Sequence, residues 1–177
     1  MKFTNKTLLV AALTAGLSIT GALAQPNTQD PNALLKKVRH ELVMLPYFGV
    51  FDNLSYRVDN GVVTLLGEVT RPTLKSDAQR VVARVEGVKA VVNEIEVLPL
   101  SPFDDRIRLA TYRAIYGYGP LQRYGLGTQP SIRIIVRNGN VFLEGIVNSN
   151  MDRTLANLRA NQVPGVFSVS NDLQVGS

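Results

Sequence analysis

The stretch VDNGVVTLLGEV, residues 58–69, decides the fold because it carries a complete β-hairpin signal. Asn60-Gly61 stands between two runs in which apolar residues alternate. This dipeptide is typical of a type I′ turn, whose two central residues both need positive φ. Counting outward from the turn gives three cross-strand pairs on the face that helices should cover: Val58–Val63, Tyr56–Leu65 and Leu54–Gly67.

The same pattern returns 78 residues later as VRNGNVFLEGIV, residues 136–147, with Asn138-Gly139 at the turn. The matches continue at the same offset into residues 85–93 and 163–171, which share the pattern V-x-G-V-x-x-V-x-N. A fixed offset indicates internal duplication, and two copies favour two tandem domains. In the second hairpin the predicted inner pairs are Val136–Val141, Ile134–Leu143 and Ile132–Gly145, and the outer pairs are Arg133–Glu144 and Ile135–Phe142.

Hydrophobic periodicity places a helix before each hairpin and another after it. The expected helices cover residues 33–45, 72–86, 102–117 and 149–162. The expected strands cover 53–58, 62–69, 88–98, 131–137, 140–147 and 165–175. We therefore predict an α+β fold of two α-β-β-α-β domains, residues 30–99 and 101–176. Each is a three-stranded sheet covered on one face by two helices, and the short proline-bearing link should hold the domains close.

The first 24 residues read as a secretory signal peptide. A positive start precedes an apolar run that ends in Ala22-Leu23-Ala24, the small residues that a signal peptidase needs. The alternative is a membrane anchor, for which the run is barely long enough. Since the chain has no cysteine, no lipid can be attached at the cleavage site. We expect cleavage near Ala24 and an exported, periplasmic, soluble protein.

Residues with catalytic or metal-binding potential are sparse. His40 is the single histidine, and without cysteines it is poorly suited to a transition-metal site. Asp104 and Asp105 fall in the first turn of a helix, where acids favour the helix dipole. The glycines at 117–127 are not followed by the Lys-Ser/Thr of a phosphate loop. We expect no catalytic residue, no metal and no cofactor, and hence no enzyme.

Charge separates the two copies. Residues 25–100 contain nine Lys/Arg and nine Asp/Glu, whereas residues 101–177 contain eight arginines and five acids. Four of the six tyrosines also lie in the second copy, in the stretch TYRAIYGYGPLQRYGLG, residues 111–127. This stretch makes the connection between the first helix and the first strand about seven residues longer than in the first copy. The second domain should therefore be the one that meets an anionic partner.

Together, the hairpin motif and the later V-x-G-V-x-x-V-x-N segment resemble the BON domain of bacterial envelope proteins. Both motifs occur twice at one offset, and the copies cover nearly all of the chain after Ala24. The resemblance implies a periplasmic protein linked to osmotic and envelope stress. It also implies a module that binds phospholipid or a protein partner and carries no catalytic residue.

Two functional hypotheses remain open. In the first, the second domain makes peripheral contact with anionic phospholipid headgroups through arginine and tyrosine, since arginine pairs with phosphate and tyrosine suits membrane interfaces. The predicted lipid contacts are Arg113, Tyr116, Tyr118, Arg123 and Tyr124. In the second hypothesis, an outer sheet face with Ile135 and Phe142 docks an envelope protein, unless that face packs on the other domain. Nucleic acid is disfavoured, and the oligomeric state is left open.

Overall fold

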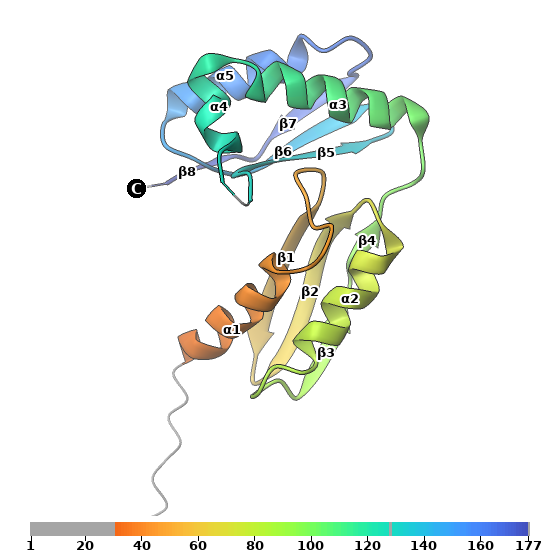
Figure 1. Cartoon of the computed structure of the whole chain (residues 1–177), viewed down its shortest axis with the longest axis vertical. Coiled ribbons are helices and arrows are strands. Elements are labelled where there is room, and N and C mark those ends of the chain that lie inside the picture. Colours follow the sequence, from red (N-terminus) through yellow and green to blue (C-terminus); the bar gives the residue numbers. More distant parts are fainter. Residues whose placement is uncertain (1–30, 128, 177) are drawn as a thin grey trace, which may run out of the picture.

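A computed structural model describes residues 31–127 and 129–176 of the chain. The predicted signal peptide lies outside these residues. The described part consists of two α-β-β-α-β units, one after the other in sequence and side by side in space (Figure 1). The predicted α+β class and the tandem arrangement are confirmed.

The first unit contains two helices and one mixed sheet. Its helices are α1 (Pro31–Val43) and α2 (Pro72–Val82), and its strands are β1 (Asn53–Asp59), β2 (Val62–Val69), β3 (Ala90–Asn93) and β4 (Glu96–Val97). Strand β1 pairs antiparallel with β2, whereas β3 and β4 both pair parallel with β2. The sheet thus has four strands in three positions, because the predicted last strand is interrupted.

The second unit repeats this topology with one addition. It contains α3 (Pro102–Tyr116), β5 (Ile132–Arg137), β6 (Asn140–Val147), α5 (Asn150–Asn161), β7 (Ser168–Asn171) and β8 (Gln174–Val175). The extra residues between the first helix and the first strand form α4 (Gly119–Gln122) and a 3-10 turn, Arg123–Gly125. The longer connection predicted from sequence is therefore folded structure packed against the domain.

Both hairpins have the predicted turn and register. Asn60 and Gly61 have φ of 50° and 86°, and Asn138 and Gly139 have φ of 52° and 77°. All six inner pairs and both outer pairs occur as counted from the turns. The four turn residues are therefore structural, because type I′ geometry needs left-handed backbone at both positions.

Gly67 and Gly145 occupy equivalent positions in the two hairpins. Both glycines sit in unbroken strand register. Their φ values are 114° and 119°, and an added Cβ would lie 2.1 Å from the Asn53 carbonyl oxygen or 2.0 Å from that of Ser131. Glycine is needed here because the neighbouring strand backbone occupies the space of a side chain.

Asn93 and Asn171 explain the interrupted third strands. The Asn93 side chain donates to the Lys75 carbonyl at 2.9 Å and accepts from the backbone N–H of Ile95 at 3.2 Å. Asn171 makes the equivalent bonds to Arg153 and Leu173. Each asparagine thus ties the strand break to the helix above, and the turn sends Ile95 or Leu173 into the core.

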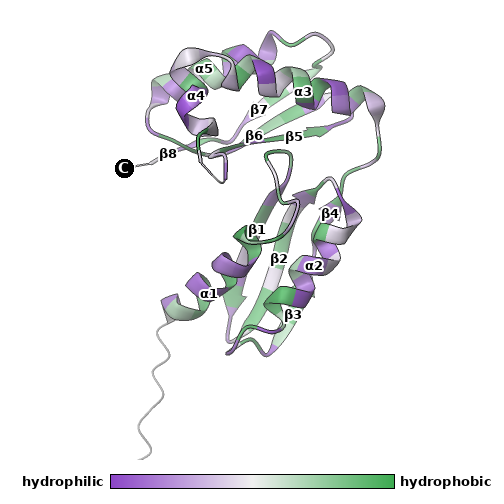
Figure 2. Ribbon diagram, viewed as in Figure 1, coloured by the Kyte–Doolittle hydropathy of each residue, from purple (hydrophilic) through white to green (hydrophobic). Residues whose placement is uncertain are grey.

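Each domain has its own hydrophobic core between its helices and one face of its sheet. Figure 2 shows hydrophobic residues along the strands and hydrophilic residues on the outer sides of the helices. The predicted stripe of α2 is buried at Leu74, Ala78 and Val82. The second core also includes the added segment, through Leu121 and Tyr124, with Val50 and Phe51 of the first unit packed against it.

The connection from α1 to β1, residues 44–52, joins the two domains. The Val50 carbonyl accepts from the Ile134 N–H at 2.9 Å, at the outer edge of β5. The Gly49 carbonyl accepts from Arg133 Nη1 at 2.8 Å. Figure 1 shows this loop reaching the second sheet beside β5, and Phe51 also contacts Tyr112 of α3. The domains are therefore in direct contact.

Candidate functional site

Tyr124 lies inside the second domain. It is 5% exposed, and its hydroxyl donates to Asp152 Oδ2 at 2.9 Å and accepts from the Asn148 N–H at 2.8 Å. Ser149 and Arg123 also donate to this carboxylate, each at 2.6 Å. We call Arg123, Tyr124, Ser149 and Asp152 the Asp152 cluster. The hydrogen bond from Ser149, together with those from Tyr124 and Arg123, lowers the pKa of Asp152.

Tyr116 is buried in the same core, with 7% of its surface exposed. Its hydroxyl donates to the Ile132 carbonyl at 2.5 Å, and burial raises the pKa of this phenol. Because Tyr116 and Tyr124 are both inside and already hydrogen-bonded, neither can reach a headgroup in this structure. The prediction that Tyr116 and Tyr124 contact lipid is therefore corrected. Both tyrosines instead hold the added segment against the second domain.

The other three predicted lipid contacts are more accessible. Arg113 is exposed on α3. Tyr118 is half-buried beneath the guanidinium of Arg159, 5.0 Å from its ring centre. The Arg123 side chain is 52% exposed, although it forms the ion pair with Asp152. For these residues headgroup contact remains a prediction, and Arg113 has the most open position.

The outer sheet face around Ile135 is turned toward the first domain. Ile135 is fully buried, and on the same strand Arg133 stacks on Phe48 of the first domain at 4.6 Å. Arg137 stacks on Phe142 at 5.3 Å and forms ion pairs with Glu68 at 2.7 Å and Glu96 at 3.4 Å. Of the two alternatives for this face, packing on the other domain is the one observed, so Ile135 is not part of an open partner face.

The helical side of the second domain is predominantly basic. Its helices carry acids at three positions, two of which are buried. Asp104 accepts from the backbone N–H groups of Asn138 and Gly139, at 3.0 and 2.8 Å, and so holds the hairpin turn. Asp152 belongs to its own cluster, and Asp105 is paired with Arg108. The exposed arginines of this side are Arg106, Arg113, Arg123 and Arg153.

An exposed aromatic pair lies at the edge of this basic side. Phe167 is 73% exposed and Phe103 is 36% exposed, with ring centres 5.9 Å apart. Arg106 lies one turn after Phe103, with its guanidinium 5.9 Å from that ring. Arg113 follows two turns further along the same side of α3. We call Phe103, Arg106, Arg113 and Phe167 the aromatic-basic edge.

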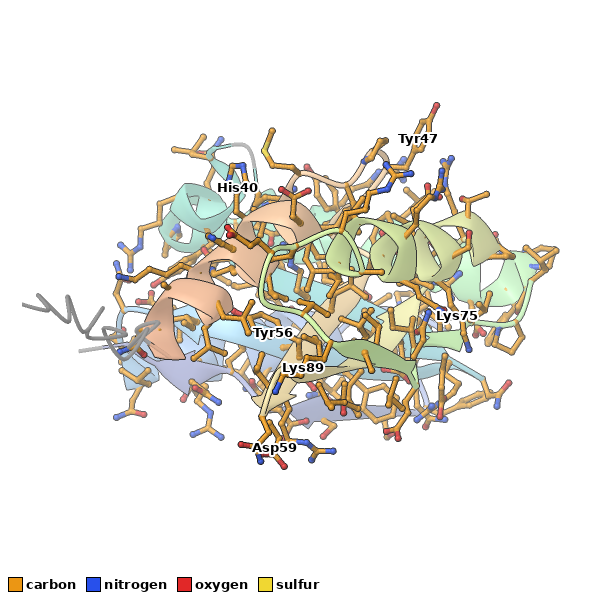
Figure 3. The ribbon with its side chains drawn as sticks, turned by 90° about the horizontal axis from the view of Figure 1, so that it is seen from below. His40, Tyr47, Tyr56, Asp59, Lys75 and Lys89 are labelled. Carbon is orange, nitrogen blue, oxygen red and sulfur yellow. The ribbon has the colours of Figure 1, made fainter. Side chains whose placement is uncertain are left out.

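Sequence reasoning missed three of these four residues, although one signal was present. At the offset of 78, Phe167 corresponds to Lys89, so the second copy has an exposed phenylalanine where the first has an exposed lysine. Lys89 packs its stem over Gly61, just as Phe167 packs over Gly139. Figure 3 shows Lys89 near the turn end of the first sheet, close to Asp59. The proximity of Phe103 depends on the tertiary fold.

The other candidates considered from the sequence are metal ligands and membrane spans. His40 is exposed on α1 and projects from the surface in Figure 3. Within the described residues, no group of three His, Cys, Asp or Glu side chains is placed to hold a metal ion. No helix in the same part of the chain is long and apolar enough to cross a membrane.

Comparison with known proteins connects this geometry to one family. The BON domain family matches residues 30–99 and 121–177. The chain is 27% identical to osmotically-inducible protein Y of Escherichia coli (strain K12), over 96% of this chain and 95% of that protein. It is 30% identical to the outer membrane lipoprotein DolP of Haemophilus influenzae, over 90% of this chain and 84% of that protein.

A solved structure of CdsD, a structural protein of the type III secretion system of Chlamydia trachomatis, is 13% identical and covers 82% of this chain, with a TM-score of 0.30.

The second family match begins at Leu121, after α3, although α3 packs on β5 and α5. Since the two family matches span well over half of the sequence and lie in separate units, the chain belongs to the BON domain family.

Proposed function

We propose that this protein is a non-catalytic module of the cell envelope whose second domain binds the surface of anionic phospholipid membranes. The contact runs through the aromatic-basic edge and the exposed arginines of α3 to α5. The relatives support an envelope setting, because one is named as an outer membrane lipoprotein and another as osmotically inducible. In that setting the protein would be exported to the periplasm and would meet the membrane from the water side.

The observation that carries this proposal is the exposed pair Phe103 and Phe167 beside Arg106 on a side with little exposed negative charge. Aromatic rings sit well at the boundary between headgroups and acyl chains. Arginine adds bidentate bonds to phosphate oxygens, which a lysine cannot match. Both kinds of contact are available here without any rearrangement of the domain.

The predicted binding is reversible and sensitive to salt. Each basic residue close to an anionic surface contributes about 1 kcal/mol, and the attraction falls off within a Debye length of roughly 8 Å at physiological ionic strength. Two ring edges at the interface add a smaller apolar contribution. The sum of these two contributions is typical of a peripheral membrane protein, and the protein would dissociate from the membrane when the local ionic strength rises.

Vesicle sedimentation tests the proposal with protein recovered after export. The protein should sediment with phosphatidylglycerol-containing vesicles and remain in solution with phosphatidylcholine alone. Arg106→Glu/Arg113→Glu should lower the affinity for anionic vesicles by about 2 kcal/mol or more, roughly 25-fold. Phe167→Lys, which introduces the residue that the first copy has at this position, should also weaken binding.

A matched control separates a defined surface from net charge. Arg80 and Arg84 are exposed on the helical side of the first domain, so Arg80→Glu/Arg84→Glu makes the same charge change elsewhere. This variant should bind nearly as well as the wild type. Equal losses in the two double variants, or equal binding to neutral and anionic vesicles, would overturn the proposed surface.

The alternative function, a protein adaptor that uses the outer sheet face, loses its predicted surface in this structure. Ile135 is fully buried, and the neighbouring Phe142 is covered in part by Arg137. A partner could reach Ile135 only by separating the domains. Phe142→Asp should therefore disturb the contact between the domains first, and unchanged NMR signals from residues 48–51 in this variant would contradict that expectation.

A further inference from the structure

A pocket of about 490 Å³ lies at the junction of the two domains. This volume falls within the range of small-molecule sites, about 300–1,000 Å³. Neither domain forms the pocket alone, because the loop before β1, the loop before α2, the link between the domains and α3 all contribute to it. Its principal lining residues are Phe51, Thr70, Arg71, Leu100, Arg108 and Leu109.

Arg108 provides a buried cation on the α3 wall. The residue is 4% exposed, with Nη1 paired to Asp105 and Nη2 donating to the Val136 carbonyl at 2.7 Å. Its Nε–H has no acceptor, and Nε is one of the buried side-chain atoms without a partner in the described part of the chain. A buried donor without an acceptor lowers the stability of the fold, so such a group is expected to bind a water molecule, an ion or a ligand.

Arg71 provides a second cation from the first domain. Its guanidinium stacks on the ring of Tyr47 at 4.7 Å, which fixes the plane while leaving the N–H donors at its rim. Figure 3 shows Tyr47 projecting from the surface of the molecule. Helix α2 begins directly after Arg71 and has no side-chain cap, so its positive end adds to the field. Two carboxylates lie near these groups: Asp105 is paired with Arg108, and the buried Asp52 accepts from the N–H and the hydroxyl of Thr70 at 2.7 and 2.8 Å. Since Asp52 is already occupied by these donors, the unpaired Nε–H of Arg108 and the rim of Arg71 are the donors left for an anion.

Apolar side chains make up the rest of the wall. Phe51 and Leu109 face the pocket from the two domains. Leu100, in the link between them, is 95% exposed, so nothing in the described chain covers it. An apolar chain lying against these three residues would remove their surface from water, whereas a purely polar anion would leave it exposed.

We propose that this pocket binds a small amphipathic anion, a carboxylate on a single apolar chain such as a free fatty acid. The carboxylate lies between Arg71 and Arg108, where it accepts from the unpaired Nε–H, and the chain lies along Phe51, Leu100 and Leu109. Since the ligand contacts both domains, its binding also stabilises their relative placement. This site is separate from the aromatic-basic edge and does not depend on membrane binding.

The probe is sodium decanoate, added below its micelle concentration to isotope-labelled protein recovered after export. Binding is followed at the side-chain Nε–Hε resonance of Arg108, which burial should protect from exchange. Decanoate should shift this resonance in a saturable way. 1-Decanol, which has no carboxylate, and acetate, which has no apolar chain, should each bind at least tenfold more weakly. Equal binding of 1-decanol, or no shift at Arg108, would overturn the proposal.

Two variants at exposed positions test the pocket without threatening the fold. Arg71→Gln and Leu100→Ser should each weaken decanoate binding by about tenfold. Leu126→Ser is the matched control, because Leu126 is also exposed, at 73%, but lies outside the pocket. Arg106→Glu/Arg113→Glu should leave decanoate affinity unchanged. A comparable loss in either control would place the ligand elsewhere and refute the assignment.

Discussion

Tyr124→Phe tests whether the tyrosines of the added segment are structural. The substitution keeps the buried ring and removes the hydroxyl that joins Asp152 to the Asn148 backbone. If Tyr124 is a core residue, the variant should lose stability and keep its affinity for anionic vesicles. If it is a headgroup contact, the reverse should hold.

The magnitude follows from the two lost hydrogen bonds. A hydrogen bond to a charged acceptor contributes about 1.5–3 kcal/mol. The Asn148 N–H adds little because that residue is exposed and water can replace the hydroxyl. We therefore expect the free energy of unfolding of the second domain to fall by about 2 kcal/mol. In a domain of this size the midpoint of thermal unfolding should fall by roughly 8–16 °C.

Urea unfolding followed by NMR signals of each domain measures this loss and separates the two domains. Tyr112→Phe is the matched control, because Tyr112 is 39% exposed on α3 and packs edge-on against Phe51 through its ring. The free energy of unfolding of the Tyr112→Phe variant should differ from that of the wild type by less than about 0.5 kcal/mol. Vesicle sedimentation of both variants should match the wild type.

The pH dependence gives an independent check. The hydrogen bonds from Ser149, Tyr124 and Arg123 lower the folded-state pKa of Asp152, so their stabilisation is present above the unfolded-state pKa, near 4. It disappears as the pH falls through the lower, folded-state pKa. The difference between wild type and Tyr124→Phe should therefore shrink below pH ~4. A loss below about 0.5 kcal/mol at neutral pH, or one that persists unchanged in acid, would refute this reasoning.

Three further substitutions, the first with its own control, test the strand packing and the contact between the domains. Gly145→Ala should destabilise the second domain by about 2 kcal/mol or more, because the backbone is left-handed there and the new Cβ would collide with the Ser131 carbonyl. Gly119→Ala is the control and should change the urea midpoint little, because no atom of the described residues lies near that position. Asn171→Ala should lower the free energy of unfolding by about 1–2 kcal/mol in the same assay, because it removes the side-chain bonds to Arg153 and Leu173 at the strand break. An unchanged urea midpoint would show that these two hydrogen bonds are dispensable. Arg137→Ala should lower stability by less than about 1 kcal/mol, and the loss should diminish in high salt; a salt-independent loss would point to its stacking on Phe142 instead.

The hairpins show how far local sequence reaches. Asn-Gly needs no tertiary help to prefer a type I′ turn, and the register follows by counting, because a slip of one residue would turn every apolar side chain outward. The duplication then carries the same conclusion to the second domain. Most helix bounds followed to within about two residues from apolar spacing and from caps such as Ser149, whose side chain accepts from the Asp152 N–H. The exception is α2, which ends at Val82 although the predicted helix ran to residue 86.

The placement of the tyrosines could not be read in this way. Tyrosine suits a membrane interface and a core equally well, because its ring is apolar and its hydroxyl needs one partner. For Tyr124 that partner is a carboxylate 28 residues away, and for Tyr116 it is a carbonyl 16 residues away. Pairings at such separations depend on how the added segment packs.

By itself, the sequence determined two α-β-β-α-β domains, their hairpins, their order and the basic character of the second, because periodicity, turn chemistry and charge are local or additive properties. Only the tertiary structure decided which faces are free. It buried Ile135 against the first domain and brought Phe103 to Phe167. It also placed Arg71 and Arg108 around one pocket. The reason is that exposure is a property of neighbours, and these neighbours come from parts of the chain that meet only after both domains have folded.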